Sequence, residues 1–114
     1  MQLSINSKEV QAVTVLNLSG DLMSPAAYAL LRDRVGELLA RNRRKVLLNL
    51  NQIGQIDSGG LGNLVRVCVS SRKQGGEIKL ANPSTTVRVA LEFTGLIRML
   101  EVYPTEQEAL ASFE

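Results

Sequence analysis

Hydrophobic residues along the chain form short runs, and these alternate with segments in which they recur every three or four positions. β-branched residues and leucines make up the run at 13–20, "VTVLNLSG", and a continuous apolar run stands at 45–50, "KVLLNL". Such runs, bounded by glycine and polar residues, predict strands. The continuous run is typical of a central parallel strand, because both faces of such a strand are covered. Further strands are expected at 77–82 and 99–103, and a short first strand at 3–7.

Helical periodicity fills the segments between these runs. Residues 26–42 carry leucine and valine at helical spacing behind Pro25, and proline is favoured in a first helical turn. Residues 60–74 show the spacing i, i+3, i+4, i+7 before two glycines, and further helices are expected at 83–95 and 105–114, the last opened by a Thr-x-x-Glu capping box. This order predicts an α/β fold with a mostly parallel sheet of about five strands and about four helices, with room for an antiparallel first strand.

The composition is that of a single globular domain over residues 1–114, with 45% hydrophobic and 21% charged residues. No uninterrupted apolar stretch approaches the roughly 18 residues of a membrane span. The chain does not open with the basic and apolar pattern of a signal peptide. We therefore expect a cytoplasmic protein. The formal net charge of +2 is too small to indicate direct binding of nucleic acid.

The sequence contains no histidine and a single cysteine, Cys68. The lack of histidine excludes Ser-His-Asp and Cys-His nucleophile pairs, together with zinc or iron sites built on imidazole. One cysteine cannot form a thiolate metal cage. We therefore expect no metal, no cofactor and no enzymatic activity. Cys68 falls on the apolar stripe of its helix, which predicts a buried small hydrophobe.

Ser58 lies in the segment "QIDSGGLGNLV", between the central strand and the next helix. Functional groups of open α/β sheets gather at the carboxyl ends of strands, and a helix N-terminus favours an anion. A structural interpretation is that Asp57 or Ser58 caps the helix. A catalytic serine would lack a histidine base or a Ser-x-x-Lys partner, and a nucleotide cradle would lack the third glycine of the dinucleotide fingerprint. In the remaining interpretation, Ser58 accepts a phosphoryl group from a separate kinase.

The segment "IDSGGLGNLV" resembles the Asp-Ser-x-Gly-Leu/Ile-Gly signature of STAS domains, of the stand-alone bacterial anti-sigma factor antagonist kind. The resemblance extends along nearly the whole chain. "VTVLNLSGDL" is similar to the family strand that ends in Gly-Glu/Asp-Leu, and "KVLLNLNQIGQIDSGGLG" is similar to the central strand with its signature loop. The segment from Gly75 to Phe113 is similar to the closing strand, helix, strand and helix.

This resemblance implies a partner switch. An unphosphorylated antagonist of this kind binds an anti-sigma factor, usually a serine kinase of the histidine-kinase-like ATPase fold, and so releases a sigma factor. The kinase phosphorylates the serine after the signature aspartate, here Ser58, and binding is lost until a serine phosphatase restores it. A phosphate adds about −1.5 to −2 charges at the interface, which is a sufficient physical means.

The resemblance also implies a partner-binding surface, formed by the signature loop, the start of the next helix and the adjacent "GDLMS" loop. The residues expected in it are Asp21, Met23, Ser24, Asp57, Ser58, Gly59, Gly60, Leu61 and Asn63. Met23 stands where many members have aspartate, and Gly59 where many have a second hydroxyl residue. The alternative is an unphosphorylated STAS scaffold or a subunit of a larger regulatory or lipid-transport complex. A small nucleotide-binding protein or phosphotransferase is the third class.

Two further features outside the signature concern packing: the apolar segment 91–100 and Gly36. The segment 91–100, "LEFTGLIRML", holds more apolar residues than one helical stripe needs. These residues either enter the core or form a partly exposed partner or homodimer surface, and they are Phe93, Leu96, Ile97 and Met99. Gly36, inside the helix expected at 26–42, costs about 1 kcal/mol relative to alanine. It is interpreted as allowing close packing on the sheet.

Overall fold

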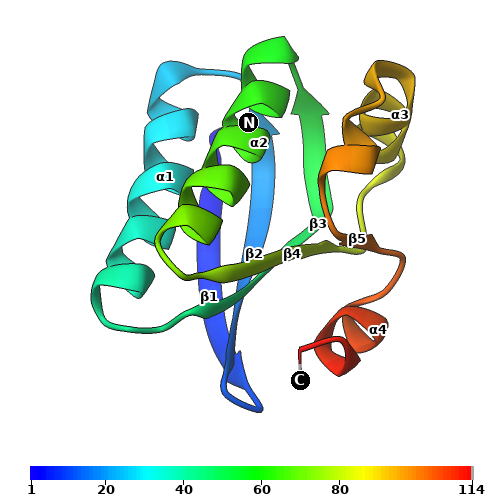
Figure 1. Ribbon diagram of the computed structural model, residues 1–114. Coiled ribbons are helices and arrows are strands. Elements are labelled where there is room, and N and C mark those ends of the chain that lie inside the picture. The colour runs from blue at the N-terminus through cyan, green and yellow to red at the C-terminus, as the bar shows by residue number, and fades with distance from the viewer. Residues whose placement is uncertain (114) are drawn as a thin grey trace.

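The computed structural model describes residues 1–113, and Figure 1 shows the course of the chain. The strands are β1 (Ser4–Val10), β2 (Val13–Leu22), β3 (Lys45–Ile56), β4 (Glu77–Ala81) and β5 (Val102–Tyr103). The helices are α1 (Pro25–Ala40), α2 (Ser58–Lys73), α3 (Thr85–Thr94) and α4 (Glu106–Ala111), with a short 3-10 helix, η1 (Leu96–Met99), after α3. The predicted order of strands and helices is confirmed. No helix among the described residues is long and apolar enough to cross a membrane.

The five strands form one mixed sheet in the order β1-β2-β3-β4-β5. β1 is antiparallel to β2, and each of the following pairs is parallel. The short turn after Val10 makes the first pair a hairpin, whereas a helix connects each later pair, as parallel strands require. The α/β fold class and the mostly parallel sheet are therefore as predicted.

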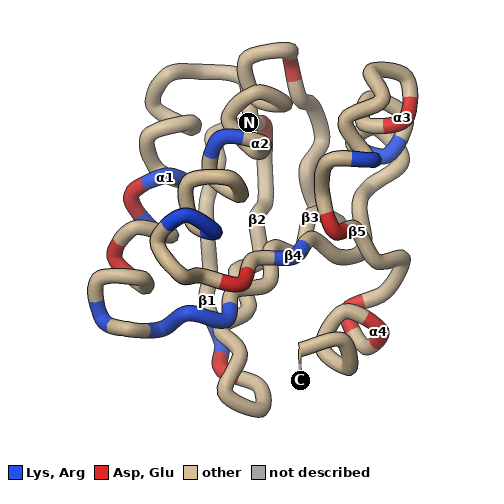
Figure 2. Tube along the Cα trace, viewed as in Figure 1, with Lys and Arg blue, Asp and Glu red and all other residues tan. Residues whose placement is uncertain are grey.

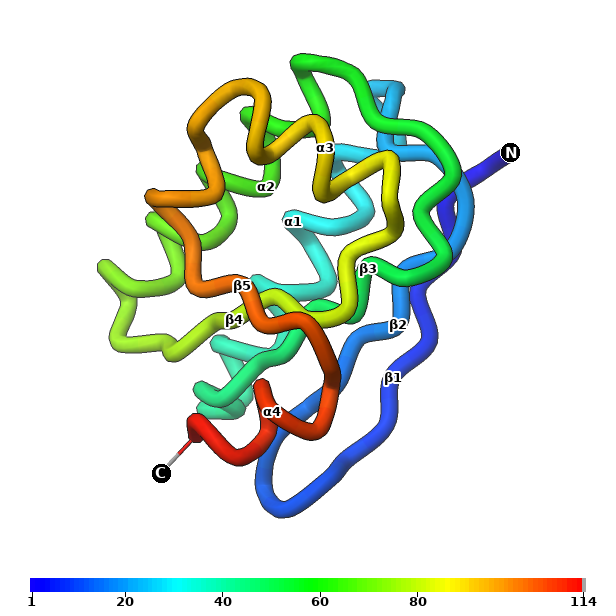
Figure 3. Tube along the Cα trace, turned by 90° about the vertical axis from the view of Figure 1, so that its right-hand side faces the viewer, coloured from blue at the N-terminus to red at the C-terminus, as the bar shows by residue number. Residues whose placement is uncertain are grey.

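Helices cover both faces of the sheet. α1, α2 and α3 lie on one face, and α4 packs on the other (Figures 1 and 3). Neighbouring residues of β3 show the division, because Leu48 belongs to the larger apolar cluster and Leu47 to the smaller one around Ala109 and Phe113. Successive side chains of a strand point to opposite faces. The continuous apolar run of β3 thus follows from cover on both sides, as expected.

The end of β3 differs from the prediction. Residues 51–56 were expected to form a loop, but they continue the strand to Ile56. The reason is that the end of β2 extends alongside them, with Ser19 opposite Gln52 and Leu22 opposite Ile56 after a shift in register. Only Ile53 of this polar stretch is deeply buried, so its local pattern did not indicate a strand.

The last elements are also shorter than predicted. The strand expected at 99–103 is limited to Val102–Tyr103, because η1 occupies the residues up to Met99. The helix expected at 105–114 spans Glu106–Ala111, with the Thr105 hydroxyl accepting a hydrogen bond from the Glu108 amide at 3.1 Å. The last residue of that prediction, Glu114, lies outside the described residues.

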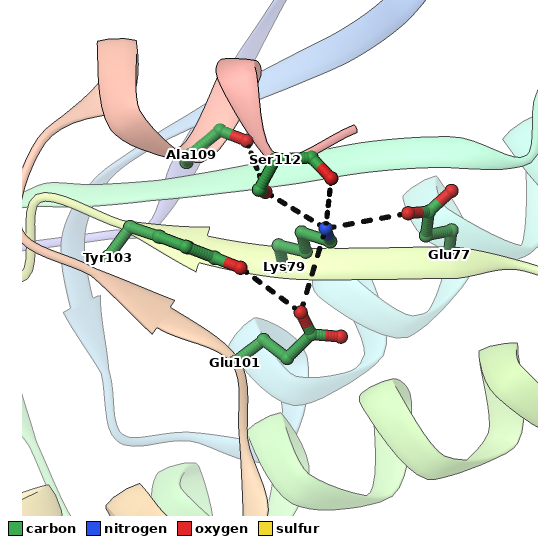
Figure 4. A network of polar contacts seen from close by, with 6 residues as sticks. All are labelled: Glu77, Lys79, Glu101, Tyr103, Ala109 and Ser112. Atoms are coloured by element: carbon green, nitrogen blue, oxygen red, sulfur yellow. Dashed lines mark hydrogen bonds and ion pairs between the residues drawn. The ribbon is translucent and has the colours of Figure 1, made fainter. Parts of the chain in front are cut away.

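Lys79 of β4 fastens the C-terminal segment to the sheet (Figure 4). Its side chain is almost buried, and Nζ donates hydrogen bonds of 2.9 Å to both the carbonyl oxygen and the hydroxyl of Ser112. Nζ also lies 3.4 Å from a Glu77 carboxylate oxygen, 3.6 Å from one of Glu101, and 4.7 Å from the centre of the Phe113 ring. A buried ammonium group needs such partners, and they hold the segment that follows α4 against the sheet.

The structure shows how the segment 91–100 and Gly36 are packed. In the segment 91–100, Leu91 and Leu100 enter the core, whereas Phe93 is 91% exposed and Met99 is 55% exposed. The interpretation of Gly36 was wrong: this glycine is exposed, and a Cβ placed on it would meet no heavy atom within 4 Å. Close packing on the sheet therefore does not explain Gly36.

Candidate functional site

The candidate site lies at the edge of the sheet where β2 and β3 end. Because these strands are parallel, their carboxyl ends meet at one edge, with Leu22 opposite Ile56. The segment from Leu22 into α1 consequently lies beside the signature, Asp57–Gly60, at the start of α2 (Figure 1). The two segments that the sequence marked as candidate loops are thus brought together, from positions far apart in the chain.

Asp57 is the N-cap of α2. Its backbone is extended, with φ −103° and ψ −178°, and its Oδ1 accepts a 2.7 Å hydrogen bond from the Gly60 amide. Its carbonyl oxygen accepts the Leu61 amide at 3.0 Å. Of the two capping residues considered from the sequence, the structure selects Asp57. The side chain of Ser58 is therefore not needed to begin the helix.

Tyr28 of α1 holds the same carboxylate and was not identified from the sequence. Its hydroxyl donates a 2.6 Å hydrogen bond to Oδ1 of Asp57. This bond, together with the Gly60 amide, lowers the pKa of the Asp57 carboxyl, and the same bond raises the pKa of the Tyr28 hydroxyl. Asp57 therefore carries its negative charge at neutral pH. The available sequence signal was a polar hydroxyl three residues before Leu31, on the apolar stripe of the helix.

Atoms of neighbouring segments lie too close to the two glycines after Ser58 to leave room for a side chain. A Cβ on Gly60 would clash with the Leu22 carbonyl oxygen and lie 2.8 Å from Cγ1 of Ile56. A Cβ on Gly59 would clash with the Tyr28 hydroxyl and lie 2.9 Å from Cζ of that ring. Tyr28 thus occupies the space that a side chain at position 59 would need.

Ser58 is the first residue of α2, and its side chain is exposed. No side-chain hydrogen bond engages its hydroxyl within residues 1–113. It stands where the amide groups and the dipole of the helix create positive potential, which favours an anion. A phosphoryl donor therefore has access to the Ser58 hydroxyl from solvent.

The β2–α1 segment adds three candidate residues with different exposure. Asp21 is partly exposed and its carboxylate contacts the amino group of Met1. Met23 is 43% exposed, and the Ser24 hydroxyl caps α1 by accepting the Ala27 amide at 3.1 Å. Among the described residues, no three histidine, cysteine, aspartate or glutamate side chains gather closely enough to hold a metal ion.

Three of the expected surface residues lie beneath the surface. Gly60 is buried, Leu61 is 6% exposed within the main apolar cluster, and Asn63 is 5% exposed. The Asn63 side-chain amide donates a 3.4 Å hydrogen bond to the Tyr28 carbonyl oxygen. Gly60 has no side chain, and the burial of Leu61 and Asn63 leaves their side chains little surface for a direct contact, so their part in partner binding stays a prediction. All three support the exposed residues around them.

Comparison with known proteins identifies relatives of this chain in sequence and in structure. Residues 4–109 match the sequence profile of the STAS domain. A Thermotoga neapolitana protein named as an anti-sigma factor antagonist is 32% identical over 103 residues, which cover 90% of this chain and 91% of the relative. The crystal structure of an antagonist so named from Thermotoga maritima superposes with a TM-score of 0.81 at 29% identity, covering 94% of this chain and 92% of the other. The anti-sigma factor antagonist SpoIIAA in its unphosphorylated form gives a TM-score of 0.73 at 25% identity, covering 94% and 93%.

Proposed function

The chain belongs to the STAS domain family, and on that basis we propose that it is an anti-sigma factor antagonist. In this proposal it binds an anti-sigma factor in the cytoplasm and so releases a sigma factor, with residues 1–114 forming one non-enzymatic domain. The relatives named as antagonists, which match over nearly their full length, support this function. The observation that carries it in this chain is the exposed Ser58 directly after Asp57, at the start of α2.

The proposed switch is phosphorylation of Ser58 by the anti-sigma factor acting as a serine kinase. The Ser58 Oγ attacks the γ-phosphorus of ATP held by the kinase, a new O–P bond forms, and the bond to the ADP oxygen breaks. The hydroxyl proton must pass to a base. This chain has no histidine, and the lowered pKa of Asp57 makes its carboxylate a weak base, so in this proposal the kinase supplies the base. A serine phosphatase would reverse the reaction by hydrolysis.

The effect of the phosphate follows from its position. The N-terminus of α2 tolerates an added anion, so the fold is retained. In the interface, however, the phosphate adds about −1.5 to −2 charges. The ionised Asp57 beside it increases the local negative charge, because its pKa is lowered by Tyr28 and Gly60. A loss of ~3 kcal/mol of binding free energy corresponds to about a hundredfold in affinity, which is sufficient for a switch.

The proposed contact surface combines the exposed residues of the two neighbouring segments. It consists of Asp21, Met23, Ser24, Asp57, Ser58 and Gly59, supported from below by Gly60, Leu61 and Asn63. Met23 supplies an apolar contact at the position where many family members have an acid. The kinase that binds here must therefore accept a thioether at that point. This requirement distinguishes its partner from kinases that recognise an aspartate.

The test is the intact mass of the protein isolated from its native cells, followed by mapping of the peptide across residues 55–66 and of the peptide that contains Ser24. The proposal expects an added phosphate on Ser58. Ser24 serves as an internal control, because its hydroxyl is engaged in the cap of α1 and should carry no phosphate. An unmodified mass under several growth conditions would instead favour a STAS scaffold without phosphorylation. Met23 and Gly59, which differ from the residues of many family members, would then account for the missing phosphorylation.

A further inference from the structure

The helices α1 and α2 lie side by side on one face of the sheet (Figure 1). Residues of both helices line a groove between them. Its volume is about 660 Å³, within the range of about 300–1,000 Å³ that is usual for small-molecule sites. Apolar side chains from both helices line it: Val35 and Leu39 from α1, and Val67 from α2. Pro25 and Tyr28 line the groove near the start of α1, whereas the exposed Ser58 does not line it.

Gly36 keeps this groove open. It lies in the interior of α1, it is exposed, and it lines the groove. A Cβ at this position would meet no heavy atom within 4 Å, and its φ is not in the left-handed region. Neither packing nor backbone conformation therefore requires glycine, although glycine is less favourable than alanine inside a helix. A larger side chain at position 36 would, however, fill part of the groove.

The charged groups that line the groove are both arginines, Arg32 from α1 and Arg66 from α2 (Figure 2 marks the basic positions on both helices). Arg66 has no acidic partner within 4.0 Å among residues 1–113, and Arg32 makes one long, exposed contact of 3.5 Å with Asp33. A Cβ placed on Gly62 would lie 3.5 Å from the Arg66 guanidinium. The Arg66 side chain therefore folds back along α2 over a glycine, where no side chain blocks it.

We propose that the groove between α1 and α2 binds an organic anion with an apolar body. The anionic group pairs with the guanidinium groups of Arg32 and Arg66, and the apolar body covers Val35, Leu39 and Val67. Two features of the lining fit such an occupant: the guanidinium of Arg66, which has no acidic partner among residues 1–113 and is free to pair with an anion, and the space over Gly36. This site is independent of the proposed switch at Ser58, although Tyr28 lies between the two.

The experiment is a titration of the full chain with decanoate, followed by amide chemical shifts in NMR, with decanol as the uncharged probe. We expect saturable shifts at Gly36, Arg66 and Val67 with decanoate and weaker binding of decanol. Gly36→Leu fills the groove and should abolish binding, whereas the matched variant Gly36→Ala should retain it. Both substitutions raise helix propensity, so both variants should fold. Arg66→Gln should weaken binding about tenfold, as expected for loss of a charge-assisted contact.

Three outcomes would overturn the proposal. These are the absence of saturable binding at millimolar decanoate, unchanged affinity in Gly36→Leu, and equal affinity for decanoate and decanol. Shifts that centre on Phe93 rather than on the groove would also count against it, because they would indicate adsorption to the exposed apolar side of α3. Thermal unfolding of each variant shows that a loss of binding does not arise from a loss of fold.

Discussion

The Tyr28 hydroxyl donates a 2.6 Å hydrogen bond to Oδ1 of Asp57, a residue 29 positions later in the chain. The same oxygen accepts the Gly60 amide, so one carboxylate oxygen both caps α2 and holds α1. The position of the residue before Ser58 therefore depends on a helix that the signature itself does not contain. A change in this hydrogen bond would therefore alter the position of Asp57, which directly precedes the proposed phosphorylation site.

Tyr28→Phe should raise the pKa of the Asp57 carboxyl toward its ordinary value. The substitution removes the hydroxyl that is the largest cause of the lowered pKa, while the Gly60 amide remains. A carboxyl titration followed by carbon NMR measures this shift directly. An unchanged Asp57 titration would show that the hydroxyl does not act on this group.

The same contact predicts a dependence of stability on pH. Because folding lowers the pKa of the Asp57 carboxyl below its ordinary value, the unfolded chain binds a proton more readily than the folded one. The stabilisation is therefore present at neutral pH and is lost as the pH falls through the folded pKa. Urea unfolding of wild type and Tyr28→Phe should show a difference in free energy at pH 7 that shrinks in acid. A difference that stays constant with pH would show that it does not arise from the ionisation of Asp57.

Gly59→Ala should destabilise the protein, by about 1–3 kcal/mol, as overpacking usually does. The new Cβ would collide with the Tyr28 ring, whose Cζ lies 2.9 Å from its position. Gly36→Ala is the matched control, because its Cβ meets nothing within 4 Å, and it should stabilise the protein by about 0.5–1 kcal/mol. Denaturant unfolding measures both changes. Combining Gly59→Ala with Tyr28→Ala should recover part of the loss, and full additivity would contradict the proposed collision.

Ser58→Ala should preserve the fold and the binding of the anti-sigma factor while abolishing phosphorylation. The hydroxyl makes no side-chain hydrogen bond within the described residues, so its removal leaves the cap at Asp57 intact. Ser58→Asp should weaken partner binding because it places a permanent charge beside Asp57. Titration calorimetry with the partner kinase distinguishes the three proteins. Wild-type affinity in Ser58→Asp would count heavily against the switch.

Cys68 should be unreactive toward thiol reagents in the folded protein. Its sulfur is fully buried, and burial raises the pKa of the thiol to about 11, so the reactive thiolate is scarce at pH 8. A chromogenic disulfide reagent should label the protein slowly without denaturant and rapidly in concentrated urea. Rapid labelling of the native protein would show that α2 separates from the sheet far more often than its packing indicates.

Much of the fold can be predicted from local pattern. Buried faces are indicated by the apolar run of β3 and by the helical spacing of Leu31 and Val35, and the end of α2 is indicated by the glycines that follow it. These signals have the period of a strand or a helix, and so they can be recognised without knowing what packs against them. The signature Asp57-Ser58 is likewise local, because an N-cap acts on amides only three residues away.

The sequence by itself therefore determined the order of the elements, the two-sided cover of the sheet and the location of Ser58 at a helix start. The tertiary structure alone decided that residues 51–56 extend a strand, that Tyr28 holds Asp57 and excludes a side chain at Gly59, and that Asn63 is buried. It also decided that Gly36 opens a groove. Each of these depends on which distant segment supplies a pairing edge, a ring or an empty space, and that neighbour is set by packing rather than by local periodicity.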